Sequence, residues 1–163
     1  KAENATLHEF YNETSMTLEI LDGCTFFPVS HYNFEMPITV NGSGTLGFDG
    51  GCRVLVSPAR VATINCDFEV MRSSESLSHD FKLYSWDGKA AGTLNMYGTV
   101  KGLTGTFTMD TPSTYRVNKV ANFGEGANVV FMRPGVFDYA GAEADAAFGK
   151  SISIAAAWFH LPT

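Results

Sequence analysis

The chain has 163 residues, of which 45% are hydrophobic and 17% are charged, and its 17 acidic and 11 basic residues give a net charge of −6. This size favours a single domain over residues 1–163, and the composition excludes a disordered chain. The acidic balance argues against nucleic acid or an anionic membrane surface as a partner, and no apolar run is long enough for a membrane span.

Alternating apolar and polar residues, interrupted by glycine-rich breaks, predict an all-β fold. In chain order we expect strands at 5–21 and 34–40, a run of six strands across 44–110, and further strands at 114–120, 127–133 and 151–161. The alanine-rich stretch 139–149 fits either one or two helical turns or a long loop.

The clearest predicted strand is 60–71, where the alternation is unbroken. One face is mostly polar, and the other face carries Ala62, Ile64, Cys66, Phe68 and Val70. This period of two is typical of a half-buried strand.

Turn signals at 49–51, 58–60, 86–89 and 101–102 allow the segments of 44–110 to pair as consecutive hairpins that share one apolar face. In this register Cys52 lies opposite Cys66, and Phe81 lies opposite Leu94. An antiparallel meander of this length leaves two open edges unless it closes. We therefore predict an up-and-down β-barrel, with a two-sheet sandwich or jelly roll as the alternative.

Two segments of the predicted meander, 92–98 (GTLNMYG) and 103–107 (LTGTF), resemble small secreted β-barrels of the dirigent and allene-oxide-cyclase-like type. The segment 7–11 (LHEFY) resembles the N-terminal strand of those proteins. The avidin and lipocalin barrels, which are calycin-like, share a looser version of the pattern. The resemblance implies a barrel with an apolar cup, and it carries over no catalytic residue.

The inner face of the predicted barrel is rich in phenylalanine and methionine. We interpret it as an apolar cup that is partly filled by its own side chains and partly open to a small ligand. The candidate ligand-binding residues are Phe81, Leu94, Met96, Phe107, Met109 and Trp158.

Three histidines, His8, His79 and His160, have inward parity in the predicted strands. They form either a polar cluster that holds a ligand, a metal or a general base, or three separate hydrogen-bonded side chains. Their spacing does not indicate a metal site, and no serine or cysteine has a nucleophile motif. We therefore predict no metal and no cofactor. Glu9 has outward parity and is expected on a solvated face.

Asparagines at 4, 12 and 41 begin glycosylation sequons, so Asn4, Asn12 and Asn41 are candidate glycan acceptors, and a secreted or extracellular protein is expected. The three cysteines allow at most one internal disulfide. Register favours a bond between Cys52 and Cys66, and the alternatives are a bond from Cys24 or three free thiols.

These observations favour a secreted or cell-surface, non-enzymatic β-barrel that binds a small apolar molecule or an extracellular partner through its cup or rim. One alternative is a dirigent- or cyclase-like enzyme, a cyclase or isomerase that acts on an apolar substrate in the cup. Another is a structural subunit of an extracellular assembly, and a homo-oligomer is compatible with it.

Overall fold

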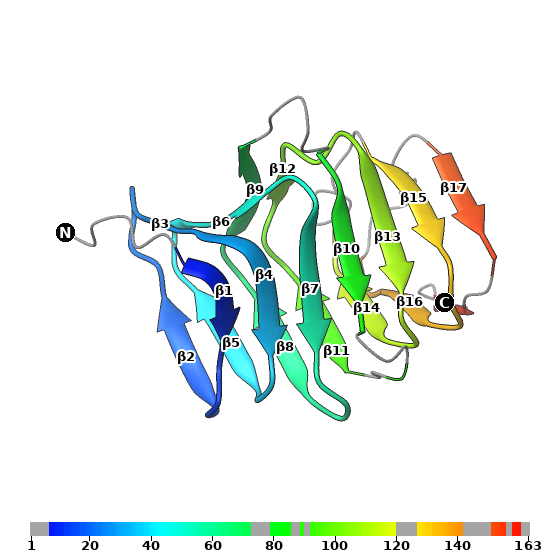
Figure 1. Cartoon of the computed structure of the whole chain (residues 1–163), viewed down its shortest axis with the longest axis horizontal. Coiled ribbons are helices and arrows are strands. Elements are labelled where there is room, and N and C mark those ends of the chain that lie inside the picture. The colour runs from blue at the N-terminus through cyan, green and yellow to red at the C-terminus, as the bar shows by residue number, and fades with distance from the viewer. Residues whose placement is uncertain are drawn as a thin grey trace.

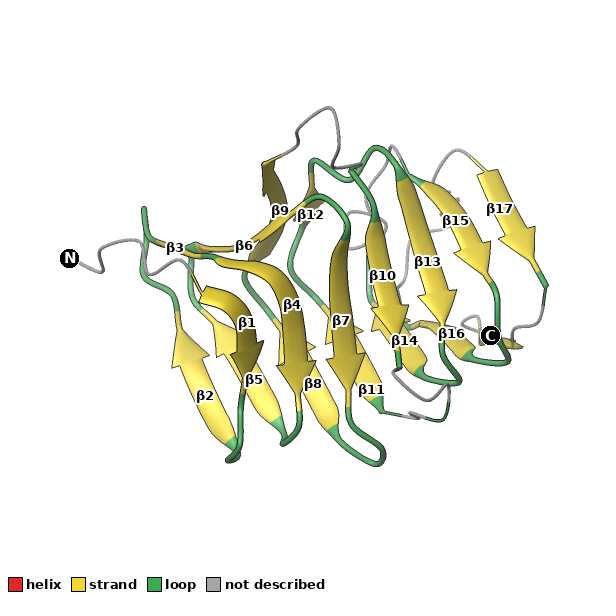
Figure 2. Cartoon of the chain, viewed as in Figure 1, coloured by secondary structure: helices red, strands yellow, loops and turns green. Residues whose placement is uncertain are grey.

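The computed structural model describes residues 7–72, 79–85, 89, 92–119, 127–141, 151–155 and 158–160, with the backbone alone at 7–8, 28–30, 72 and 158–160. Throughout these ranges the regular elements are β-strands (Figure 2). The same ranges hold no helix with the length and apolar character that crossing a membrane requires.

The strands form three sheets, which we name A, B and C. In spatial order, sheet A contains β1 (Leu7–Tyr11), β4 (Pro28–Phe34), β7 (Cys52–Val56), β10 (Phe81–Tyr84), β13 (Thr106–Asp110), β15 (Asn128–Phe131) and β17 (Ser151–Ile154). Sheet B contains β18 (Trp158–His160), β16 (Val136–Tyr139), β14 (Thr114–Val117), β11 (Thr93–Met96), β8 (Val61–Ile64), β5 (Ile38–Asn41) and β2 (Met16–Glu19). Sheet C contains β12 (Val100–Lys101), β9 (Asp67–Arg72), β6 (Thr45–Asp49) and β3 (Thr25–Phe26).

The chain is all-β, but its strands pair in parallel and form a β-solenoid. Consecutive strands lie in different sheets, and each strand pairs with the equivalent strand of the turn before and the turn after (Figure 1). The predicted antiparallel meander closing into a barrel is therefore wrong, and so is the sandwich or jelly-roll alternative. No consecutive pair among the described strands forms a hairpin.

The turns of the solenoid repeat at intervals of about 22 residues, with longer intervals from β7 to β10, from β8 to β11, from β9 to β12 and from β10 to β13. For example, Tyr115 on β14 pairs with Phe137 on β16. In the part of the chain that the structure describes, β12 is the last strand of sheet C, and sheets A and B continue to β17 and β18. The core-facing side chains of successive turns stack on one another.

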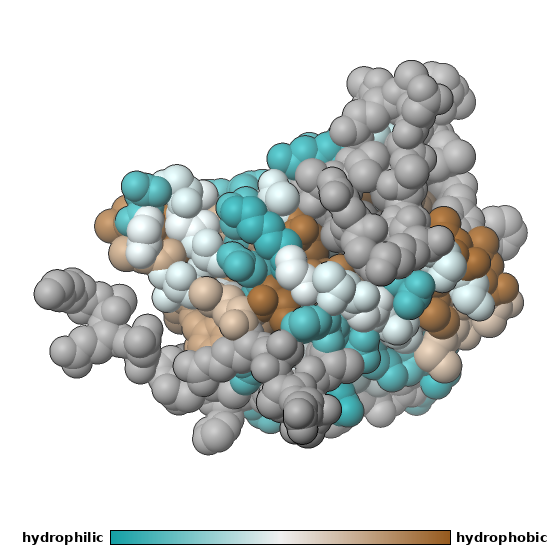
Figure 3. All heavy atoms as spheres, turned by 90° about the horizontal axis from the view of Figure 1, so that it is seen from above, coloured by the Kyte–Doolittle hydropathy of each residue, from teal (hydrophilic) through white to brown (hydrophobic). Residues whose placement is uncertain are grey.

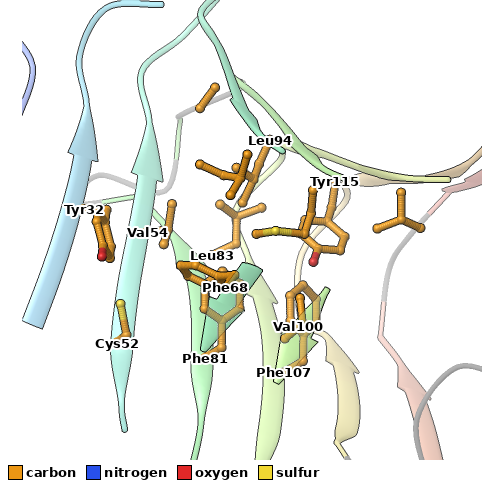
Figure 4. Packing of buried hydrophobic residues seen from close by; sticks show 14 of the residues in the cluster. Tyr32, Cys52, Val54, Phe68, Phe81, Leu83, Leu94, Val100, Phe107 and Tyr115 are labelled. Atoms are coloured by element: carbon orange, nitrogen blue, oxygen red, sulfur yellow. The ribbon is translucent and has the colours of Figure 1, made fainter. Parts of the chain in front are cut away.

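Aromatic rings dominate the stacked core (Figure 4). The rings of Phe81 and Phe107, on neighbouring strands of sheet A, lie 5.3 Å apart with an interplanar angle of 19°. Phe68 from sheet C meets Phe81 edge to face at 5.6 Å and so joins two walls. These contacts bury large apolar areas and account for much of the folding free energy.

The predicted strand 60–71 illustrates what the alternation reveals and what it does not. Its apolar face is correctly predicted, because Ala62, Ile64, Cys66 and Phe68 are all at most 2% exposed. The chain nevertheless bends after Ile64, so the segment divides into β8 of sheet B and β9 of sheet C. In the same way, the predicted strand 5–21 divides into β1 and β2.

The predicted disulfide is also wrong, because Cys52 and Cys66 are both free, buried thiols. Cys52 begins β7 of sheet A, whereas Cys66 lies at the bend before β9 of sheet C. The register that placed them opposite each other required a hairpin. In the solenoid, Cys52 is instead the partner of Phe81.

The last described strand of sheet A exposes side chains that point toward the core in earlier turns. Ile152 and Ile154 pair with the buried Val129 and Phe131, yet they are 48% and 54% exposed. Hydrophobic surface is visible at this end of the molecule, on the right of Figure 3.

Candidate functional site

The residues predicted to bind a ligand in a cup lie in the solenoid core. Five of them are between 0% and 2% exposed, namely Phe81, Leu94, Met96, Phe107 and Met109. Figure 4 shows Phe81, Leu94 and Phe107 in the core. Their side chains fill the space between sheets A and B. Trp158 lies on β18 at the end of sheet B, where it pairs with Val136, and its side chain is outside the described part of the structure.

The structure does not bring the three predicted histidines together. His8 lies on β1 at one end of sheet A, and His160 lies on β18 at the opposite end of sheet B. The side chains of both are outside the described part. His79 lies just before β10, where its Nδ1 shares a hydrogen bond with the Thr104 hydroxyl at 2.9 Å.

The outer face of sheet A carries a group of aromatic and charged side chains that we call the sheet A cluster, defined as Glu9, Tyr11, His31, Arg53 and Tyr84. They come from β1, β4, β7 and β10, which are neighbours in the sheet. Strand parity places them outward, because the residues between them face the core.

Direct contacts connect the members of the sheet A cluster. The Tyr11 hydroxyl donates a hydrogen bond of 2.5 Å to Oε2 of Glu9. The guanidinium carbon of Arg53 lies 5.7 Å from the centre of the Tyr84 ring, which is a cation–π contact. The His31 ring meets the same tyrosine edge-on, with 6.3 Å between ring centres. Tyr84 is only 6% exposed, so it forms a fixed support for the exposed Arg53.

The protonation states of the sheet A cluster follow from burial and from these contacts. Burial lowers the pKa of His31, and Arg53 lowers it further against the opposing effect of Glu9, so His31 is neutral at pH 7. Burial raises the pKa of Tyr84 to about 12. The hydrogen bond to Glu9 is the main reason for the raised pKa of Tyr11. Both tyrosines therefore keep their protons at neutral pH.

Charges of both signs surround the sheet A cluster, and besides Glu9 a second carboxylate, Glu35, acts electrostatically on Tyr11. Arg53 pairs in register with Lys82 on β10, which places two cations on neighbouring strands. Asp110 accepts from Lys82 at 2.6 Å and also from Arg133 at 2.8 Å. Within the described ranges, Arg53 has no carboxylate within ion-pair distance. Like charges side by side destabilise a sheet, so an anion between Arg53 and Lys82 would be favoured.

A buried amide lies in the same part of the face. Asn33 is 0% exposed, between the positions of Tyr11 and Leu55, and its amide lies close enough to the Tyr11 hydroxyl to lower the pKa of that group.

Sequence reasoning missed most of the sheet A cluster. It placed Glu9 outward, but it did not connect that residue with His31 or Arg53. The available signal was the interval, because Glu9, His31 and Arg53 follow one another at about 22 positions and therefore align in a parallel solenoid.

Comparisons of the chain with protein-family models, with curated proteins and with solved structures gave no match.

Proposed function

We propose that this chain is a non-enzymatic binding protein that holds an extended, carboxylate-bearing ligand, an acidic saccharide, on the outer face of sheet A. The single observation that carries the proposal is the exposed Arg53, supported by the Tyr84 ring and left without a carboxylate partner among the described residues. Its second support is the neighbouring Lys82, whose aspartate is shared with Arg133.

The chemistry of each group suits this ligand. A guanidinium binds a carboxylate through two parallel hydrogen bonds, and the Tyr84 ring reduces the conformational freedom that Arg53 would lose on binding. The Tyr11 ring is 50% exposed and offers an apolar surface to the carbon face of a sugar ring. Glu9 has further acceptor positions for sugar hydroxyls besides the one that Tyr11 occupies.

The size of the sheet A cluster favours an extended ligand. Neighbouring strands are about 4.8 Å apart, so β1 and β10, three spacings apart, are separated by roughly 14 Å. A ligand that reaches both Glu9 and Arg53 must cross the intervening β4. The sequons at Asn4 and Asn41 support the further proposal that the protein acts outside the cell, where such saccharides occur.

Isothermal titration calorimetry with tetragalacturonate tests the proposal, and its fully methyl-esterified form serves as the neutral control. We expect Arg53→Gln to lower the affinity for the acid at least tenfold, because a charge-assisted contact contributes about 1.5–3 kcal/mol. Arg60→Gln makes the same charge change in the exposed turn before β8, and it should alter the affinity less than twofold. Equal losses in the two variants, or equal binding of the acid and the ester, would contradict the proposal.

A further inference from the structure

A second feature lies on a different wall of the solenoid. The outer face of sheet B contains an open hollow of about 420 Å³ that crosses β2, β5 and β8. It is lined by Ser15, Met16, Thr17, Pro37, Ile38, Thr39, Val61 and Thr63. None of these residues is charged, in contrast to the sheet A cluster.

Three threonines form a straight row along the hollow. Thr17 pairs with Thr39, and Thr39 pairs with Thr63, so their side chains occupy equivalent positions on adjacent parallel strands. Equivalent atoms on such strands repeat at about 4.8 Å. The row therefore offers a regular series of hydroxyl groups, each beside a methyl group.

Asn95 on β11 continues the row and orients its last hydroxyl. Its Nδ2 donates a hydrogen bond of 3.1 Å to Oγ1 of Thr63. Because this oxygen already accepts a bond, the Thr63 hydroxyl hydrogen is available to a ligand or to a neighbouring hydroxyl. The Asn95 Oδ1 is buried and has no hydrogen-bond partner among the described residues.

Charge marks the boundary of the hollow. Beyond Asn95, the next two positions of the row are Arg116 and Asp138. Their side chains form an ion pair of 2.6 Å, so the two charges compensate each other. Within the hollow, Pro37 and Val61 lie two positions before Thr39 and Thr63 along the chain and share their outward face. Val61 is 42% exposed. The hollow thus combines neutral hydroxyl groups with apolar carbon surface.

We infer that this hollow is a binding site for a neutral saccharide, separate from the sheet A cluster and independent of the function proposed for it. A sugar ring presents hydroxyl groups at its edge and C–H groups on its faces. The threonine hydroxyls can donate hydrogen bonds to that edge and can also accept them from it. The methyl groups, together with Pro37 and Val61, contact the C–H surface, and no charged group has to be desolvated.

NMR titration of the whole chain with four neutral tetrasaccharides, cellotetraose, mannotetraose, maltotetraose and xylotetraose, tests the inference. At least one should shift the backbone amide signals of 15–17, 37–39 and 61–63. Thr39→Val keeps the branched shape and removes one hydroxyl, so it should weaken binding about three- to tenfold, the effect of one net hydrogen bond. Thr39→Arg fills the hollow and should abolish binding.

Thr108→Val is the matched control, because Thr108 is a half-buried outward residue on sheet A. It should bind the tetrasaccharide as the unmodified chain does. The inference is overturned if none of the four sugars shifts these signals, or if Thr39→Arg binds with unchanged affinity.

Discussion

The guanidinium of Arg53 lies over the ring of Tyr84, with 5.7 Å between the guanidinium carbon and the ring centre, although two other strands separate β7 from β10 in the chain. Arg53 is exposed and Tyr84 is buried, so the ring holds the arginine in place while its charge faces solvent. This relationship exists because parallel pairing places Arg53 beside Lys82 on the neighbouring strand, two positions before Tyr84.

Truncation of a stacked core ring tests the packing of the solenoid. Phe107 is 0% exposed and lies between Phe81 and Tyr115, at 5.3 Å and 4.8 Å. Phe107→Ala should lower the free energy of unfolding by about 3–5 kcal/mol, because it leaves a cavity. Urea denaturation measures the loss. Thr108→Ala, one position along and facing outward, should cost less than about 1 kcal/mol. Similar losses in the two variants would contradict the packing.

The three thiols should differ in reactivity. Cys24 is exposed, whereas burial raises the pKa of the Cys52 thiol and, less strongly, that of Cys66. Because the thiolate is the reactive form, a thiol reagent should label Cys24 rapidly in the folded protein. The other two cysteines should react only after denaturation, without any reductant. If denatured, unreduced protein yields a single reactive thiol, a disulfide is present and the assignment fails.

Asn12 belongs to a sequon, but its amide is used within the fold. The side chain is 2% exposed, and its Nδ2 donates to the carbonyl oxygens of Met36 at 2.8 Å and Thr14 at 3.3 Å. Asn12→Asp removes both donors and should lower the free energy of unfolding by about 1–3 kcal/mol. In a thermal melt, Asn128→Asp should be nearly neutral, because Asn128 is exposed and its oxygen accepts from Ser151, which an aspartate also allows. An unchanged midpoint for Asn12→Asp would show that its amide is dispensable.

Glycan, if present on this protein, should therefore be found at Asn4 or Asn41 rather than at Asn12. Asn41 is half-buried, and its oxygen, not its nitrogen, is used in the bond from Asn65 at 2.7 Å. Peptide mapping of protein from its natural source decides this. Occupancy at Asn12 would contradict the contacts described for that side chain.

The Asp110 carboxylate should make stability depend on acidity. Its bonds to Lys82 and Arg133 lower its pKa below the ordinary value of 3.8. A depressed folded-state pKa contributes stability that is present above the unfolded pKa and is lost as the pH falls through the folded pKa. In thermal melts at pH values from neutral down to below the folded-state pKa, Asp110→Asn should have a lower melting temperature than the unmodified chain at neutral pH. Its melting temperature should then fall less as the pH is lowered. Parallel curves for the two proteins would contradict this role.

The alternation of residues predicted which side chains face inward, but not which strands pair. Ala62 and Ile64 point into the core as expected, since their parity is the same in a hairpin and in a solenoid. A turn such as Asp49-Gly50-Gly51, where Gly51 has a φ of 81°, joins two strands of one hairpin or turns a solenoid corner equally well. Only the number of residues between equivalent strands of successive solenoid turns distinguishes the two folds in the sequence. The long β7–β10 and β8–β11 intervals obscure this repeat.

The sheet A cluster was harder to predict for a related reason. No local window contains both His31 and Arg53, and neither belongs to a motif. Their proximity follows from parallel register alone, so it could be inferred only after the fold was correct. The threonine row depends on register in the same way, since Thr17, Thr39 and Thr63 lie on three separate turns.

The most direct test of the central claim is a heteronuclear NMR titration of the labelled chain with tetragalacturonate. The account predicts that the shifted amide signals belong to residues 9–11, 31–33, 53–55 and 82–84, four segments far apart in sequence that meet on the outer face of sheet A. Shifts confined to one segment, to the outer face of sheet B, or to none of these residues at saturating ligand would contradict it.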